Sequence, residues 1–222
     1  LKNIVTGGRS VGLTKREKYL RHAEILKEYL KSKPNDPRSL YYLAQSYRDA
    51  GEQELALSSY QTRAVLPGWD QESYDAMLQA ALCLERLGRV AEALLQLQRA
   101  WVFRKSRRDA LYHCVRILRI LGHHKLAIHF ADTAYAIDPD TSDILFVDKG
   151  ASSWKLDDET AVSAYWDGDY KRAFDLSLRA LETMEPKSEA RDRINGNAIL
   201  ARDKLLEKTR KPTVMFRQHV MH

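Results

Sequence analysis

The chain has 222 residues, of which 44% are hydrophobic and 30% are charged, and its net charge is +6 at pH 7. Only ten glycines and six prolines occur, and good helix formers dominate, which argues against sandwiches and barrels built from many tight turns. No run of about 18 apolar residues is present, so a membrane-spanning helix is not expected. Because positive and negative residues are interspersed, the moderate basic excess does not by itself indicate an acidic partner.

The helical periodicity of apolar residues predicts a first helix over residues 15–32, after an irregular segment 1–14 that we expect to join an upstream domain. Four helix pairs and a last helix follow, and they are predicted over 36–66, 71–104, 107–137, 156–184 and 187–208. The connector 138–155 contains an apolar patch, Ile144–Val147, which we expect to dock internally. We therefore predict one helical repeat domain over residues 15–208, followed by a loose tail, 209–222.

A repeated pattern of glycine and alanine marks these helix pairs. Glycines that end a helix stand at Gly51, Gly88, Gly122 and Gly168. Five residues after each glycine comes an alanine, and seven residues further on three of the four repeats have alanine again, whereas the first has Arg63. Glycine adopts the left-handed conformation that ends a helix, and alanine lets two helices approach closely. Since one hairpin cannot bury its apolar face alone, such hairpins stack.

The period and these positions resemble the tetratricopeptide repeat, and the first repeat matches its pattern best, at Leu43, Ala44, Tyr47, Gly51, Ala56 and Tyr60. The resemblance implies an all-α fold, a right-handed superhelix of about four tetratricopeptide-like hairpins with flanking helices. A generic helical bundle is the alternative.

Four stretches occur in order along the chain and read "YYLAQSYRDAG" (41–51), "PGWDQESY" (67–74), "DILFVDKGASSW" (143–154) and "SAYWDGDYKRAF" (163–174). Together they resemble the helical repeat region C-terminal to the catalytic domain of certain bacterial family 2 glycosyltransferases. The resemblance covers about residues 7 to 205. It implies a region that presents a protein partner or glycan acceptor to an upstream glycosyltransferase domain, or that helps the enzyme form homo-oligomers.

The catalytic domain of that family needs an α/β sheet and an Asp-x-Asp string that holds a divalent metal. No alternation of strand and helix patterns occurs in this chain. Its two Asp-x-Asp strings, at 138–140 and 167–169, enclose a proline and a glycine that end helices, where Asp is a common turn and capping residue. We therefore expect no catalytic residue, no metal site and no cofactor, and interpret the chain as a non-catalytic binding scaffold.

In the tetratricopeptide pattern the first helix of each pair lines a concave surface. We predict that Tyr, Arg, Gln and Trp residues at its inward positions contact the partner, because such side chains combine large area with directional hydrogen bonds. They are Arg38, Tyr41, Gln45, Arg48, Tyr112, Arg116, Arg119, Tyr165 and Trp166. Arg116 and Arg119 lie three apart on one helical face, and with Arg48 they could clamp a carboxylate or phosphate.

Two other functions stay open. One is a free-standing protein–protein adaptor with no enzyme attached. The other is a phosphate-rich ligand or RNA binder that uses the basic run 103–108 together with two later arginines. The residues concerned are Arg104, Lys105, Arg107, Arg108, Arg116 and Arg119. Nucleic acid is not the expected partner, because aromatic residues are not interleaved with this run as a stacking platform.

The remaining candidates for chemistry have structural interpretations. Cys83 and Cys114 lie among apolar residues in helical patterns, so we expect buried thiols in a reducing compartment, the cytoplasm. His123 and His124 are adjacent with no third ligand nearby in the sequence, which is typical of a polar turn rather than a metal site. Trp69, Trp101 and Trp154 are predicted to fill gaps between repeats.

Overall fold

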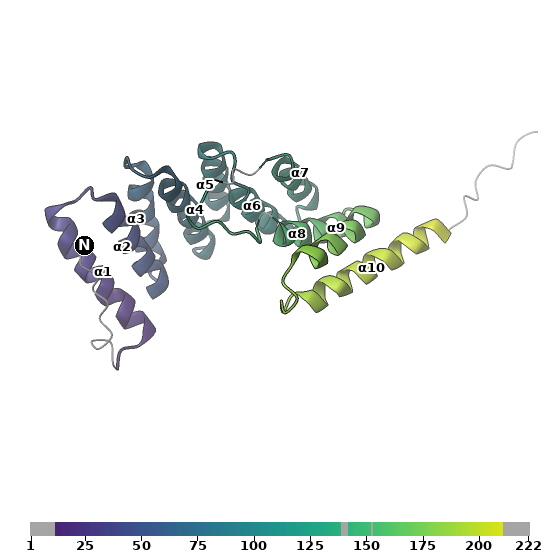
Figure 1. The fold of residues 1–222 in the computed structure, drawn as a ribbon, viewed down its shortest axis with the longest axis horizontal. Coiled ribbons are helices and arrows are strands. Elements are labelled where there is room, and N and C mark those ends of the chain that lie inside the picture. Colours follow the sequence, from purple (N-terminus) through teal and green to yellow (C-terminus); the bar gives the residue numbers. More distant parts are fainter. Residues whose placement is uncertain (1–11, 139–141, 152, 211–222) are drawn as a thin grey trace, which may run out of the picture. The chain divides into compact units, whose positions relative to one another are not determined.

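The computed structural model describes residues 12–138, 142–151 and 153–210, and every regular element in these ranges is an α-helix (Figure 1). The helices are α1 (Lys15–Ser32), α2 (Pro37–Ala50), α3 (Gln53–Val65), α4 (Asp70–Arg86), α5 (Val90–Phe103), α6 (Asp109–Ile120), α7 (His124–Tyr135), α8 (Trp154–Trp166), α9 (Tyr170–Thr183) and α10 (Arg191–Arg210). The predicted first helix, the four helix pairs and the last helix are all confirmed.

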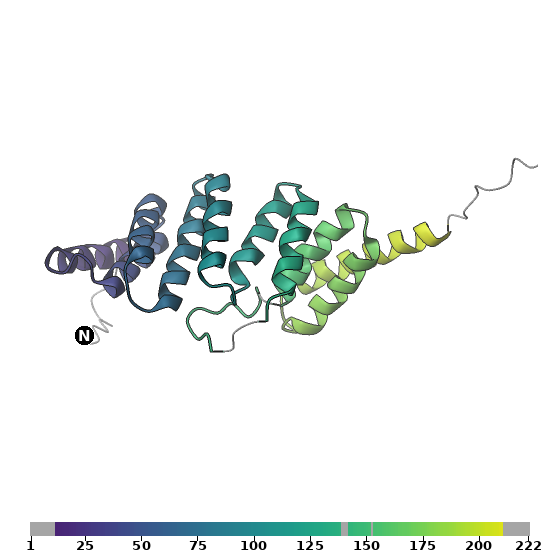
Figure 2. The same ribbon diagram turned by 90° about the horizontal axis from the view of Figure 1, so that it is seen from above.

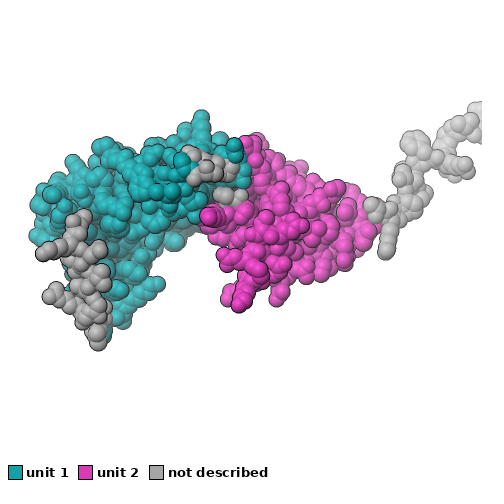
Figure 3. All heavy atoms as spheres, viewed as in Figure 1, with its two compact units in different colours: residues 1–114, 137–147 teal, residues 115–136, 148–222 magenta. Residues whose placement is uncertain are grey.

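The chain divides into two compact units (Figure 3). Unit 1 consists of residues 1–114 and 137–147, and unit 2 consists of residues 115–136 and 148–222, so that α6 contributes to both. In unit 1 each helix from α1 to α5 packs on the next, and in unit 2 each helix from α7 to α10 does the same. Figure 2 shows the antiparallel pairing of consecutive helices within each unit. Each unit is therefore a stack of helical hairpins.

The four glycines that the repeat pattern singles out end the first helix of each hairpin. All four have a left-handed backbone, with φ between 76° and 86°. In every case the N–H of the residue after the glycine donates a hydrogen bond of 2.9 Å to a carbonyl five residues earlier. This arrangement satisfies carbonyl groups that the end of a helix leaves without a partner, and it turns the chain into the second helix.

The alanines of the pattern lie in the cores of the two stacks. All seven are buried, and they are Ala56, Ala93, Ala100, Ala127, Ala134, Ala173 and Ala180. A larger side chain at these positions would push the helices apart, so the small residue sets the spacing of each stack.

Arg63, which replaces an alanine in the first repeat, has 0% of its surface exposed. Its Nε donates to Glu72 Oε1 at 2.7 Å, and its terminal nitrogens donate to Ser73 Oγ and to the carbonyls of Leu66 and Trp69. Arg63 therefore holds the turn between α3 and α4 from within.

Most of the predicted core residues are confirmed, and one prediction is wrong. The aromatic residues Tyr47 and Tyr60 and both cysteine thiols are buried. Trp69, however, is 41% exposed and does not fill a gap between repeats. It lies in the turn before α4, where its carbonyl accepts the hydrogen bond from Arg63 and its side chain is partly exposed.

We predict opposite stability effects for two alanine substitutions in unit 2. Gly122→Ala should lower the free energy of unfolding by about 1–2 kcal/mol, because φ is +77° there and alanine is strained in the left-handed region. The matched control Gly196→Ala, inside α10, should raise it by about 0.5–1 kcal/mol through helix propensity. Neither added Cβ meets another atom within 4 Å, so crowding does not contribute. Urea unfolding measures both effects, and shifts in the same direction would contradict this account.

Candidate functional site

Four of the predicted contact residues share one face of α2, and three of them bond to α4. Arg38, Tyr41, Gln45 and Arg48 follow one another at helical spacing. Arg38 and Tyr41 each bond to the α4 residue 34 positions later, and Arg48 bonds to the α4 residue 31 positions later. Arg38 pairs with Glu72, and the Tyr41 hydroxyl donates to the buried carboxylate of Asp75.

The same layer continues along α2 toward its C-terminal end. Gln45 Nε2 lies 3.4 Å from the Tyr41 hydroxyl oxygen, and Arg48 Nη1 donates to Gln79 Oε1 at 3.0 Å. Arg48 Nε also donates to Asp49 at 2.9 Å. The predicted residues of the first repeat are therefore brought together, but as a polar layer that joins two hairpins.

Burial shifts the titration of this layer. Removal from water raises the pKa of Asp75 above its ordinary value of 3.8, and the hydrogen bonds from Tyr41 and Gln79 oppose that shift. Burial, together with the negative charge of Asp75, raises the pKa of Tyr41 as well. The layer is thus held by hydrogen bonds in a poorly solvated environment, where each group depends on its neighbour.

The arginines of the basic run 103–108 form ion pairs and hydrogen bonds within unit 1. Arg104 pairs with Asp70 at 2.5 Å and also with Asp143, while Arg107 is buried and donates to Asp109 at 2.8 Å. Arg108 donates to the carbonyl of Ile137. This finding weighs against the interpretation of the run as a phosphate-binding surface, because its three arginines already have carboxylate or carbonyl partners. Lys105, its remaining charge, is exposed.

Of the predicted contact residues in α6, Tyr112 is nearly buried beside the ring of His113. Arg119 pairs with Glu159 of α8, whose pKa is raised by burial although Arg119 opposes that shift. Arg48 belongs to unit 1, whereas Arg116 and Arg119 belong to unit 2. The expected three-arginine clamp thus remains a hypothesis, and at least Arg119 already has a carboxylate partner.

The last two predicted residues form an exposed aromatic surface in unit 2. Trp166 is 68% exposed, and its ring stacks on His124 with centroids 6.2 Å apart and planes 13° from parallel. Tyr165 meets Trp166 edge to face at 5.9 Å. Beside them is a hollow of about 130 Å³ between α8, α9 and α10. We call this surface the Trp166 face, and it is lined by Val162, Tyr165, Trp166, Ser177, Asn197 and Leu200.

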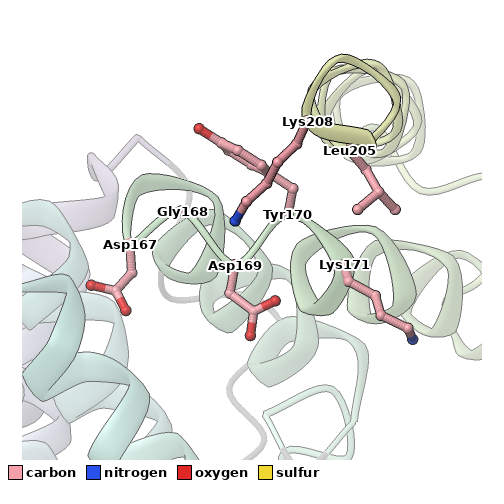
Figure 4. Close-up of a pocket in the computed structure, with 7 residues that line it drawn as sticks. All are labelled: Asp167, Gly168, Asp169, Tyr170, Lys171, Leu205 and Lys208. Carbon is pink, nitrogen blue, oxygen red and sulfur yellow. The ribbon is translucent and has the colours of Figure 1, made fainter. Parts of the chain in front are cut away.

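The Asp-x-Asp string at 167–169 lies at a second hollow of unit 2, of about 310 Å³, at the turn between α8 and α9 (Figure 4). Asp169 accepts the backbone N–H of Arg172 at 3.1 Å and caps α9. In Figure 4 the Asp167 and Asp169 side chains leave the turn separately, and Lys208 approaches from α10. Of the string at 138–140, only Asp138 belongs to the described residues.

Within the described residues, no group of three or more His, Cys, Asp or Glu side chains is arranged to hold a metal ion. None of the described helices combines the length and the apolar character that a membrane crossing requires.

Comparison with known proteins supports the repeat architecture. Residues 38–62 and 75–102 match the family model of the tetratricopeptide repeat. No curated protein matches the chain in sequence.

Solved structures of tetratricopeptide proteins are similar in fold. The C-terminal part of a TPR repeat-containing protein from Cytophaga hutchinsonii has a TM-score of 0.61 at 21% identity, over 86% of this chain and 74% of that one. A thermophilic TPR protein of Thermus thermophilus has a TM-score of 0.55 at 20% identity, over 82% and 91%. The chain has a tetratricopeptide-like fold. MamA from Desulfovibrio magneticus RS-1 is also similar, with a TM-score of 0.54 at 15% identity, over 80% and 98%.

Sequence reasoning missed four of the residues that hold the polar layer and the connector in place, and it assigned Arg107, which also holds the connector, to a basic binding surface instead. The four missed residues are Gln71, Glu72, Asp75 and Asp143. A signal for two of them was present, because Glu72 and Asp75 each stand 34 residues after their partners on α2, which is the tetratricopeptide period. No comparable signal marked Gln71 or Asp143.

We predict that Asp75→Asn changes the pH dependence of stability. Since the pKa of Asp75 is raised in the folded chain, its contribution is fully present below about pH 3.8 and is lost as the pH rises through the folded-state pKa. The free energy of unfolding of the wild type, minus that of Asp75→Asn, should therefore fall as the pH rises above about 3.8. Glu159 titrates equally in both proteins and cancels. Urea unfolding at a series of pH values measures the difference, and a flat or rising difference would refute the prediction.

Proposed function

We propose that the chain is a non-catalytic scaffold that binds a protein partner, and that the Trp166 face of unit 2 is its main contact surface. Stacked tetratricopeptide hairpins suit a protein-interaction scaffold. The observation that carries the proposal is the 68% exposure of Trp166 beside a small apolar hollow. A large aromatic next to a pocket is the type of residue that dominates binding energy in protein interfaces.

We further propose that this scaffold is the partner- or acceptor-recognition region of a family 2 glycosyltransferase, or a region through which that enzyme forms homo-oligomers. The support for this step is the ordered set of four stretches between residues 41 and 174. A free-standing adaptor suits the same fold equally well, since fold alone does not select a function.

Binding of RNA or another phosphate-rich ligand is the less favoured alternative. Arg104, Arg107 and Arg119 each form an ion pair with a carboxylate of the chain itself. A phosphate would have to compete with these internal partners. Binding that is carried by phosphate contacts would also weaken steeply with added salt, which a partner held by the Trp166 face would not show.

We expect Trp166→Ala to weaken partner binding by about 30-fold or more, the range of an interface hot spot. The partner is captured with the wild-type chain, identified, purified, and titrated against both variants by calorimetry. Val65→Ala is the matched control, because Val65 is an exposed apolar residue of unit 1, 82% accessible, and should change the affinity less than about twofold. Equal affinities of wild type and Trp166→Ala would place the contact surface elsewhere.

The glycosyltransferase context has its own test. We expect the reading frame upstream of Leu1 to encode an α/β domain with an Asp-x-Asp string, and the chain alone to release no nucleotide from sugar nucleotides. A start codon close to Leu1 would favour the free-standing adaptor. Measurable sugar-nucleotide turnover by the chain alone would contradict its assignment as a non-catalytic scaffold.

A further inference from the structure

Residues 142–147, which we call the strap, belong to unit 1 and follow its helices in Figure 2 as a segment without helix. Hydrogen bonds to their backbone hold them in place. Gln71 Oε1 of α4 accepts the N–H groups of Ile144 at 3.0 Å and Leu145 at 2.9 Å. Arg107 donates to the carbonyls of Leu145 at 3.2 Å and Phe146 at 3.1 Å. Two side chains of the helical scaffold therefore satisfy four backbone groups of a segment that has no secondary structure of its own.

The side-chain contacts add selectivity to this backbone recognition. The Asp143 side chain is 1% exposed, and Arg104 grips its carboxylate through two nitrogens, with Nε at 2.8 Å. Arg107 Nη1 lies 3.6 Å from the same carboxylate. Three residues further on, the ring of Phe146 stacks on Tyr41 with centroids 5.9 Å apart. The contacts of the strap with specific side chains thus come from an acidic residue and from an aromatic residue three positions later.

The strap is nevertheless an incompletely buried occupant. Ile144 is 77% exposed and Phe146 is 51% exposed, so much of its apolar surface remains in water. Phe146 also has φ of +48°, in the left-handed region that non-glycine residues rarely adopt. Such a conformation persists only where surrounding contacts hold it, and here the contact is the hydrogen bond from Arg107 to the Phe146 carbonyl.

If the strap left its position, the side chains that bind it would lose their hydrogen-bond donors and a carboxylate partner. Gln71 would lose both backbone donors, and Arg104 would lose its two-nitrogen contact with a carboxylate while keeping Asp70. Buried polar groups that lose their partners are costly. The charge and hydrogen-bond pattern of the site therefore matches an extended acidic segment and does not match an apolar or basic one.

We propose that Tyr41, Gln71, Arg104 and Arg107 form a binding site, the strap site, for an extended segment of a partner protein. This segment carries an acidic residue followed three positions later by an aromatic residue, and the strap is an intramolecular competitor that holds the site closed. The strap site lies in unit 1 and does not depend on the Trp166 face of unit 2. A failure of either proposal leaves the other standing.

Competition gives the proposal a quantitative signature. A segment tethered to its own binding site acts at a high effective concentration. The apparent association constant of an added ligand then equals its intrinsic association constant multiplied by the fraction of molecules in which the site is open. The probe is a fluorescent peptide with the sequence of residues 142–147, capped at both ends, and its binding is measured by fluorescence anisotropy. The variant Asp143→Ala with Phe146→Ala weakens the strap but leaves the strap site intact.

We expect the strap variant to bind this peptide at least about tenfold more tightly than the wild type does. Ile144→Ala is the matched control, since its exposed side chain makes little contact with unit 1, and it should bind as the wild type does. Arg104→Gln added to the strap variant should abolish the gain, and so should Asn in place of Asp in the peptide. Equal affinities of wild type and strap variant, or no binding by a folded strap variant, would overturn the proposal.

Amide hydrogen exchange of the wild type tests the same proposal without any variant that could misfold. At saturating peptide, the amide protons of Ile144 and Leu145 should exchange with solvent faster, because Gln71 no longer accepts them. Unchanged exchange at saturation would show that the peptide does not displace the strap. A wild-type dimer that Asp143→Ala dissociates would assign the strap site to a second copy of the chain, and it would likewise overturn the proposal.

Discussion

Buried carboxylates near the start of the first helix of a hairpin hold both stacks in register. In unit 1, Glu72 accepts hydrogen bonds from Arg63 of α3 and Arg38 of α2, which joins three helices at one point. In unit 2, Asp157 accepts the Tyr135 hydroxyl at 2.8 Å and pairs with Arg179. A buried carboxylate without its partner would be strongly destabilising, so these contacts define the register of neighbouring helices even where their net contribution to stability is small.

Buried carboxylates of this kind also fix the positions of side chains at the two proposed surfaces. Gln71 directly precedes Glu72, so the contact that fixes α4 against α2 and α3 also positions the amide that receives the strap. Asp158 of unit 2 is paired with Arg193 of α10 at 2.7 Å. That pair ties α8 to α10, the two helices that carry Trp166 and Leu200 at the hollow of the Trp166 face. The two proposed binding surfaces therefore rest on helices that are tied to their neighbours by ion pairs of buried carboxylates.

The sequence predicted the hairpins well because their determinants are local. A glycine that ends a helix and an alanine that permits close approach act through neighbours in the chain, and their spacing is visible without the structure. The candidate site was less predictable because its partners are distant. Arg104 and Arg107 look like a solvated basic turn until Asp143, 39 residues after Arg104, is brought beside them. The left-handed Phe146 and the division into two units also lacked a local signal.

The two proposed surfaces differ in how they would select a partner. The Trp166 face is apolar and already formed, so its affinity would come from filling a hollow and would depend little on charge. In the strap site, Gln71 and Arg107 bind backbone groups, and a segment of any sequence has such groups. Its selectivity would come only from the contacts with the acidic residue and the aromatic residue. Because an internal segment already supplies both, a partner with weaker complementarity would be excluded by competition. A partner must therefore bind the strap site tightly enough to displace the strap, whereas a partner of the Trp166 face has no such competitor.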